Sequence, residues 1–544
     1  MFPKTYNVLA VTLIITLGGI YLNADSLKLP SFLELRQFRT ANNHAIYKLE
    51  EFMSITNQIG ALGTYYLTGS LISIILLDLI GRVSSFQVSS LFWISLVGIY
   101  STNIWMLISG RLIKGVANGV FSCSLSVYVF EVIPYSKKGL ILSVVQWSCA
   151  WGILLKYLIN YGSILITKNF SFRLSWALEM LPSIFLLILA FFLPESPKFL
   201  AATSRWGDAA KVLERIRDNV PESTGYARRQ QQQEQQEQQQ DAQQEQQFKL
   251  KARFEGNKSA TSFNQLKGTV EKVLEEYNQS TANSSFLDLF SKKLYKNTLV
   301  GVGTAFIVQI INFNLHLFYL GYFYEVLNIS DDHTGLFDMS IQYCINIIFT
   351  IFPILLLDGI RRKDTIVFGI FILGICHFCI GLMISILNNK QLMISNEDME
   401  GTNPSSSFIL AFSFLFVAVF ASTVSTTGWI YSIEIFPSSL RTKGTALVLS
   451  VSWFTNGLIS FSTPFLLKFL NWGFFILLAI LCLISCCIIL IFFPETFLLN
   501  DFEIKFIFDK DNLNLNQFDE KKSDVITLEK SEKLLQEPKK LKES

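Results

Sequence analysis

Two short segments far apart in the chain carry the same pattern of charges. EVIPYSKK begins at Glu131 and EIFPSSLR begins at Glu434; in each, a proline follows three residues after the glutamate and a basic residue stands at the eighth position. Both segments come directly after a long apolar run. A charge stranded in hydrocarbon costs about 2.5–3.5 kcal/mol or more, so each charge needs an opposite partner close by. The chemistry that this pattern indicates is ion pairing, since no nucleophile–base pair accompanies it.

Two further charged markers accompany each segment in the same order. DLIGR (78–82) and PESP (194–197) flank the first copy, and DGIRR (358–362) and PET (494–496) flank the second. An internal repeat in a membrane protein indicates two homologous bundles with a site between them. The charged members are Asp78, Arg82, Glu131, Lys138 and Glu195, and Asp358, Arg362, Glu434, Arg441 and Glu495. We expect each set to form a cytoplasmic latch that holds this side closed; the alternative is that the charges only anchor the topology.

The elements that position these charges are membrane spans. The chain has 544 residues, of which 51% are hydrophobic and 16% charged, against roughly 25% charged in soluble domains. The apolar residues come in blocks of about 18–25, the length that crosses about 30 Å of hydrocarbon. A net charge of +2 over this length gives no indication of nucleic-acid binding. The chain therefore reads as a polytopic protein of the lipid bilayer.

The apolar blocks predict an all-α membrane protein with twelve transmembrane helices in two six-helix bundles. The expected spans are about 7–23, 58–77, 86–104, 106–130, 140–160 and 174–193, then about 298–320, 339–357, 366–388, 408–432, 446–466 and 471–493. The bundles occupy residues 1–198 and 298–496. A cytoplasmic loop at 199–297, with short helices, separates them, and a flexible cytoplasmic tail at 497–544 follows.

Lysines and arginines of the short loops fall on one side if both termini are cytoplasmic. Two sequons, at Asn169 and Asn328, then face outside, where N-glycosylation takes place. The glutamine-rich run of the central loop cannot bury enough apolar surface to fold. We interpret it as a linker, with partner binding as the alternative.

All eight cysteines lie inside apolar runs, which argues against a disulfide framework. The CHFC spacing at 376–379 is metal-like, but the surrounding sequence predicts a spanning helix, so packing is the favoured interpretation and no cofactor or metal is expected. The N-terminal apolar stretch fits either a signal peptide or a first transmembrane helix. We favour the helix because of GGIYLNAD at 18–25.

Together, GGIYLNAD, GRLIKGVANG (110–119), EVIPYSKKG and PESPKFL resemble the sugar porters of the major facilitator superfamily, specifically their fungal hexose-transporter-like branch. The resemblance covers nearly the whole chain outside the glutamine run and the tail. It implies a major facilitator fold, transport instead of enzymatic catalysis, a monomeric state and residence in the plasma membrane.

The resemblance also implies a set of site residues. Amides bind sugar hydroxyls without a charge to desolvate. The matching substrate-binding positions are Gln146, Gln309, Asn314, Asn346, Trp429 and Asn456; Tyr319 matches a gating aromatic, and Asp25 with Arg111 matches a pair that couples transport to protons. Any one buried amide alone is more often a helix–helix hydrogen bond, and a structural salt bridge is the alternative for the charged pair.

The sequence departs from the family pattern in the seventh and tenth helices. Val308 stands where the family has a second glutamine, and TVSTTGW before Trp429 lacks the family's prolines. The function that we expect is alternating-access transport of a hexose or related polyol, as a facilitator or a proton symporter. The alternative from another class is a non-transporting sugar receptor or nutrient sensor of the same fold.

Overall fold

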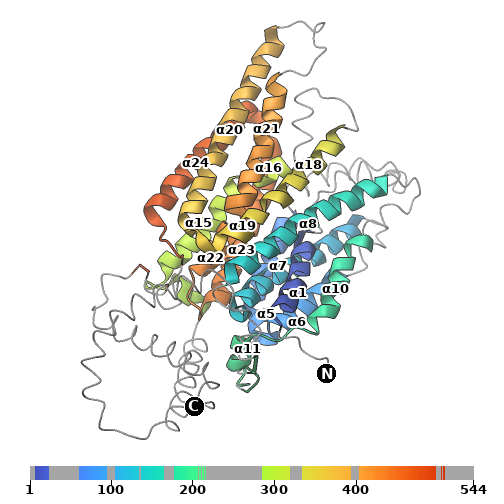
Figure 1. Ribbon diagram of the computed structural model, residues 1–544, viewed down its shortest axis with the longest axis vertical. Coiled ribbons are helices and arrows are strands. Elements are labelled where there is room, and N and C mark those ends of the chain that lie inside the picture. The colour runs from blue at the N-terminus through green and yellow to red at the C-terminus, as the bar shows by residue number, and fades with distance from the viewer. Residues whose placement is uncertain are drawn as a thin grey trace, which may run out of the picture. The chain divides into compact units, whose positions relative to one another are not determined.

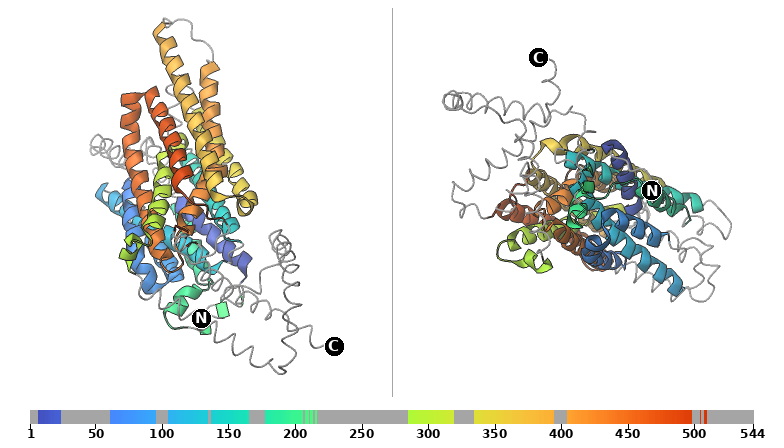
Figure 2. Two further views of the ribbon diagram at one scale, coloured as in Figure 1. Left: turned by 90° about the vertical axis from the view of Figure 1, so that its left-hand side faces the viewer. Right: turned by 90° about the horizontal axis from the view of Figure 1, so that it is seen from below.

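The computed structural model describes residues 7–23, 61–94, 104–133, 137–164, 177–205, 285–318, 334–393 and 404–497, and a few positions near 207–215 and 504–508. Residues 1–219 and 285–499 belong to one compact unit. Its elements are helices throughout the described ranges (Figures 1 and 2).

The first half contributes helices on both sides of its charged markers. They are α1 (Val8–Asn23), α5 (Ala61–Ile80), α6 (Arg82–Trp93), α7 (Ile104–Val132), α8 (Lys138–Ile164), α10 (Leu181–Ala190) and the short α11 (Pro197–Ala202). The third expected span, about 86–104, is a helix whose described part starts earlier, at Arg82. Its start follows Gly81, which adopts a φ of 90° that a side chain rarely allows.

The second half repeats this arrangement. Its elements are α15 (Tyr295–Ile310), α16 (Phe313–Phe318), α18 (Thr334–Phe349), α19 (Ile351–Leu356), α20 (Arg362–Met393), α21 (Pro404–Val419), a π-helical turn (Phe420–Val424), α22 (Ser425–Glu434), α23 (Arg441–Leu470) and α24 (Trp472–Phe492). Within the described residues, 8 helices are long and apolar enough to cross a membrane, and three shorter apolar ones lie at Val8–Leu22, Tyr66–Ile80 and Ala177–Ala190.

Three of the expected spans are not continuous α-helices, and the eighth is interrupted at Thr350, between α18 and α19. The seventh, about 298–320, breaks between α15 and α16 at Asn312, whose φ is 59°, a backbone conformation that asparagine tolerates better than most residues. The tenth passes through the π-helical turn before α22. Such turns inside α-helices often lie at functional sites, and this one lies where the family pattern has prolines.

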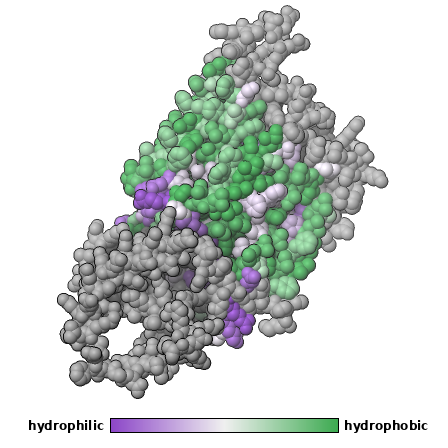
Figure 3. All heavy atoms as spheres, in the orientation of Figure 1, coloured by the Kyte–Doolittle hydropathy of each residue, from purple (hydrophilic) through white to green (hydrophobic). Residues whose placement is uncertain are grey.

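Large apolar side chains cover the outside of the helices. Leu79, Phe368 and Ile491 are 71%, 61% and 72% exposed, and Figure 3 shows hydrophobic side chains over most of the described surface in view, with hydrophilic ones toward one end. Exposed apolar surface on this scale would be unfavourable in water and is what lipid contact requires. The chain therefore crosses the membrane several times.

Close packing between helices depends on small residues. A Cβ added to Gly119 of α7 would lie 2.2 Å from the carbonyl oxygen of Tyr66 and 2.8 Å from the Cα of Gly69 in α5. The two backbones therefore touch at paired glycines, as membrane helices commonly do. The two halves also pack on each other: α23 contacts α5 and α7, and α8 contacts α18 and α19.

Candidate functional site

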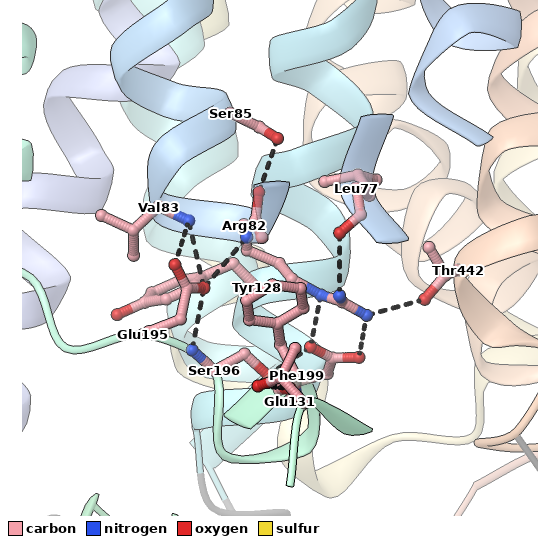
Figure 4. A network of polar contacts seen from close by, with 12 residues as sticks. Leu77, Arg82, Val83, Ser85, Tyr128, Glu131, Glu195, Ser196, Phe199 and Thr442 are labelled. Carbon is pink, nitrogen blue, oxygen red and sulfur yellow. Dashed lines mark hydrogen bonds and ion pairs between the residues drawn. The ribbon is translucent and has the colours of Figure 1, made fainter. Parts of the chain in front are cut away.

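Arg82, at the start of α6, is the centre of a buried charge cluster in the first half (Figure 4). Its Nε and Nη2 donate to the two carboxylate oxygens of Glu131 in α7, at 2.9 and 3.0 Å. Its Nη1 donates to the carbonyl of Leu77 at 3.1 Å, and Glu131 also accepts from the hydroxyl of Ser196 at 2.5 Å. This paired fork geometry compensates two charges that are nearly removed from water.

Glu195 caps the same helix. Its carboxylate accepts from the backbone N–H of Arg82 at 2.9 Å and of Val83 at 3.2 Å, where the partial positive charge of a helix N-terminus lies. Burial raises the pKa of the Glu195 carboxyl, against the opposing effect of these amides and of the Arg82 charge. Asp78 is exposed, and no hydrogen bond or ion pair joins it to Arg82 in the described part of the chain.

The second half builds a looser copy around Arg362. Its Nε lies 3.6 Å from Glu434, and its Nη2 lies 3.9 Å from Asp358. Glu495 accepts from the backbone N–H of Arg362 at 3.0 Å and of Lys363 at 3.2 Å, as Glu195 does in the first half. The repeated sequence markers thus give repeated geometry, with a closer ion pair in the first half.

Hydrogen bonds also join each cluster to the other half of the molecule. Nη2 of Arg82 donates to the hydroxyl of Thr442 in α23 at 3.2 Å. The backbone N–H of Leu140 in α8 donates to Asp358 at 3.2 Å. The Asp358 carboxylate also fills the space over Gly139, where an added Cβ would lie 2.0 Å from its oxygen. At this end the two halves are in direct polar contact.

The two basic residues of the repeated segments meet on one aromatic ring. Lys138 Nζ and the Arg441 guanidinium carbon lie 5.5 and 5.4 Å from the ring centroid of Phe130 in α7. Arg441 also donates to the carbonyl of Phe436 at 3.1 Å. Cations at this distance from an aromatic face are attracted to it, so Arg441 of one half interacts with a residue of the other.

Three of the candidate amides bond to one another or to serines. Nε2 of Gln146 in α8 donates to the hydroxyl of Ser425 in α22 at 2.7 Å, joining the halves. Gln309 of α15 donates to the hydroxyl of Ser452 at 2.9 Å and accepts from the amide of Asn456 at 2.9 Å. These glutamines therefore already bind hydroxyl groups, which is the chemistry that a sugar presents.

The helix that carries Trp429 packs against the helix that carries Gln309. Gly428, directly before Trp429, packs on Val308, directly before Gln309: an added Cβ would lie 2.8 Å from the Val308 side chain. Within the described residues, Nε1 of Trp429 and the hydroxyls of Thr426 and Thr427 are buried without a hydrogen-bond partner. Buried polar atoms of this kind usually have partners, so α22 presents polar groups in need of one.

Asn314 and Asn346 stand on other helices of the second half, α16 and α18. Asn314 is half-buried and Asn346 is 7% exposed. Tyr319, Asp25 and the two sequon asparagines, Asn169 and Asn328, lie outside the described residues, as does the side chain of Arg111.

Several polar residues with partners in the structure were not predicted from the sequence. Ser425 and Ser452 carry no signal beyond their helical spacing from Trp429 and Asn456. In the first half, Glu179 forms an ion pair with Lys156 of α8 and lies 3.8 Å from Lys114 of α7, and all three side chains are buried. All three charges lie inside predicted spans. Because charges within the membrane pair with one another, their presence could have predicted this ion-pair cluster.

Two bundles of membrane-spanning helices with matched charge clusters define a transporter of the major facilitator type. The chain belongs to the Sugar (and other) transporter family, whose sequence pattern matches residues 11–261 and 249–508. This confirms the resemblance and identifies a transporter family, not an enzyme family.

Known proteins support the same assignment. A high-affinity glucose transporter of Kluyveromyces lactis is 26% identical over 505 residues, covering 91% of this chain and 84% of the relative. A high glucose sensor of Saccharomyces cerevisiae is 23% identical and covers 85% of this chain, which spans 55% of the sensor. The solved structure of a proton:xylose symporter bound to 6-bromo-6-deoxy-D-glucose has a TM-score of 0.69 at 19% identity, covering 90% of this chain and 96% of the other. The structural likeness confirms the predicted fold.

Proposed function

We propose that this protein transports a hexose or a related polyol across the membrane by alternating access. The observation that carries the proposal is the pair of glutamines, Gln146 from one half and Gln309 from the other, each bonded to a serine hydroxyl. A sugar hydroxyl offers the same donor and acceptor as a serine. A sugar between the halves would therefore exchange these internal bonds for its own.

The other candidate residues complete this proposed site. Trp429 supplies a flat apolar face for the sugar ring, and its indole N–H is a donor with no partner in the described residues. Three further helices add the amides of Asn314, Asn346 and Asn456. In this proposal Tyr319 is a gating residue that closes access to the site. Alternating access follows if the site is exposed to one side while the contacts between the halves close the other.

The charge clusters supply that closure in the proposal. The bonds Arg82–Thr442 and Leu140–Asp358 exist only while the halves are together at this end. We assign this end to the cytoplasm because basic loop residues favour that side. The same rule places both termini and the central loop in the cytoplasm, and the family default is the plasma membrane.

Uptake of radiolabelled hexoses, pentoses and polyols in a transporter-null host tests the proposal. We expect saturable uptake of at least one sugar, reduced in Gln309→Ala at equal surface expression. No uptake of any of them by correctly folded protein would contradict transport of this substrate class.

A nutrient sensor is the second candidate, since a glucose sensor is among the relatives and the prolines of the tenth helix are missing. Saturable sugar binding to the purified protein without uptake in cells would favour it. Net transport would exclude a purely sensory role.

Energy coupling is a separate question within transport. Asp25 and Arg111 are proposed as a charge pair that takes up a proton, because proton binding to the carboxylate would release the arginine. Symport predicts alkalinisation of the medium on substrate addition, abolished in Asp25→Asn while exchange persists. Uptake that is insensitive to pH and to protonophores would indicate a facilitator.

A further inference from the structure

The break in the seventh span exposes backbone groups that an unbroken helix would satisfy. α15 ends at Ile310 and α16 begins at Phe313, with Asn312 at a φ of 59° between them. Carbonyls at a helix end lack their intrahelical partner and need another one when they are buried. The side chains that satisfy this break therefore control whether it keeps its present shape.

Side chains of other helices hold the break. Nε2 of His377, in α20, donates to the carbonyl of Ile311 at 3.0 Å. The amide of Asn312 donates to the hydroxyl of Thr463, in α23, at 3.1 Å. The peptide unit at the break is thereby fixed from two neighbouring helices.

The short helix after the break is held in the same way. Gln342, in α18, donates from its amide to the carbonyl of His316 at 2.8 Å. The His316 ring shares a hydrogen bond of 3.0 Å with the hydroxyl of Ser413, in α21. The outer part of the seventh span is thus attached to the second half by hydrogen bonds at a few specific atoms.

Two of these residues are histidines in contact with one aromatic ring. His316 and His377 are both 0% exposed, and their ring centroids are 5.1 Å apart. The ring of Phe416 stacks on His316 at 3.9 Å and lies 4.7 Å from His377. Both imidazoles are therefore enclosed in an apolar, aromatic environment.

The hydrogen bond to Ile311 fixes the tautomer of neutral His377. A carbonyl only accepts, so the ring proton is on Nε2 and Nδ1 carries the lone pair. Nδ1 is buried and has no hydrogen-bond partner in the described part of the chain. It is the atom to which a proton would add, and nothing in the described structure compensates the resulting charge.

No carboxylate forms a hydrogen bond or an ion pair with His377 in the described part of the chain. Apart from His316, the ionisable residues near the middle of the helices that pack on His377 are the thiols Cys376 and Cys379 of α20 and Cys482, Cys486 and Cys487 of α24. Lys390 lies 13 residues further along α20, roughly 20 Å away at 1.5 Å per residue.

Helix α18, which bonds to the carbonyl of His316 through Gln342, carries Asp338 and Tyr343. α21 and the π-helical turn carry no ionisable residue. Residues 362–364 of α20 lie 13–15 residues before His377, roughly 20–22 Å away at 1.5 Å per residue. Tyr431 and Glu434 of α22 belong to the same charged end.

We propose that neutral His377, together with His316, locks the break in the seventh span, and that proton binding to His377 releases it. The neutral pair fits the buried pocket and holds the Ile311 carbonyl. A protonated His377 would be a buried cation, and the attraction of Phe416 for it is smaller than the cost of removing it from water. Proton uptake therefore requires the pocket to open, and α16 to move away from His377.

The direction of the pH dependence follows because the buried form of the histidines is the neutral one. Neutral histidine predominates above its ordinary pKa of about 6.5, so the locked form is favoured there. Acidification favours the open form. Asn314, a candidate substrate residue, lies on α16, so opening would move it relative to the glutamines of the proposed site.

Hydrogen–deuterium exchange of the purified full-length protein in lipid nanodiscs tests the proposal. Wild type and His377→Gln are compared at about pH 7.5 and about pH 5.5, on either side of the ordinary histidine pKa. Glutamine keeps an N–H for the Ile311 carbonyl but does not titrate. Comparison at equal pH cancels the intrinsic pH dependence of exchange.

After correction for the intrinsic exchange rate, we expect residues 311–316 of wild type to be less protected at about pH 5.5 than at about pH 7.5, by several-fold and at most about tenfold per pH unit for one proton. The His377→Gln protein should lose this difference. Gln342→Leu is the matched control: it removes a hydrogen bond from the same segment without removing a titrating group. It should weaken protection at both pH values and keep the pH dependence.

Two results would overturn the proposal. One is equal pH dependence in wild type and His377→Gln. The other needs no variant: wild-type exchange of this segment that, corrected against an unstructured reference peptide, is the same at both pH values.

Discussion

Arg82 and Thr442, which belong to different halves of the molecule, are joined by a hydrogen bond of 3.2 Å from Nη2 to Oγ1. The same guanidinium is paired with Glu131 in its own half. The charge cluster of the first half is therefore directly attached to the second half. A change within the cluster should alter how firmly this end of the protein closes.

Replacing Thr442 with valine removes this bond with little change in shape. A hydrogen bond contributes about 0.5–1.5 kcal/mol net, so the closed state should lose that much relative to the open one. We expect faster maleimide labelling of a cysteine introduced at this end, after the exposed Cys344 and Cys487 are replaced by serine. Thr445→Val is the control, since the Thr445 hydroxyl has no hydrogen-bond partner in the described residues. Equal labelling rates in both variants would show that the bond does not contribute to closure.

The two clusters should differ in strength. Glu131 meets Arg82 at 2.9 Å, whereas Glu434 lies 3.6 Å from Arg362. Loss of one partner of a buried pair costs about 3–5 kcal/mol where the pair is close. We expect Glu131→Gln to lower the apparent unfolding temperature more, and to increase labelling more, than Glu434→Gln. The reverse order would contradict this reading of the distances.

The glutamine of α15 should affect substrate binding. Gln309→Ala removes the partner of both Ser452 and Asn456 and, under the proposed function, bonds to the sugar. Each bond contributes about 0.5–1.5 kcal/mol, so affinity should fall roughly two- to tenfold. Thr304→Ala on the same helix is the control, because its hydroxyl bonds to the carbonyl of Val300. Unchanged affinity in Gln309→Ala at normal surface expression would remove Gln309 from the site.

The charged cluster around Glu179 should act as a unit. Lys156 pairs with Glu179, and Lys114 lies 3.8 Å from it and 4.5 Å from the ring of Trp93. Glu179→Gln leaves lysine charges poorly compensated and should destabilise the protein by about 3–5 kcal/mol. The double variant with Lys156→Met should lose less than the sum of the single losses, as coupled residues do. Additive shifts in apparent unfolding temperature would show that the pair is not coupled.

Several features of the fold were predictable because they depend on local sequence. Apolar blocks of membrane length predicted where the described spans lie and in what order, and the confirmed family assignment followed from motifs read in order. The repeated acidic markers include Glu131 and Glu195, which bond to Arg82, and also Asp78, which does not bond to it in the described part of the chain. In contrast, the prediction of regular helices across Asn312 and across residues 420–424 was wrong. At these two places the local backbone depends on packing and on side-chain hydrogen bonds from other helices.

What the sequence alone determined is which residues enter the membrane and which of them carry charge, because hydrocarbon excludes unpaired polar groups wherever the chain folds. Tertiary structure alone decided the pairings across long separations: Arg82 with Thr442, Gln146 with Ser425, and His377 with the carbonyl of Ile311. Spacing along one helix predicts which face a residue occupies, whereas its partner depends on the rotation and depth of a second helix. Those are set by the packing of many side chains at once, which no single motif encodes.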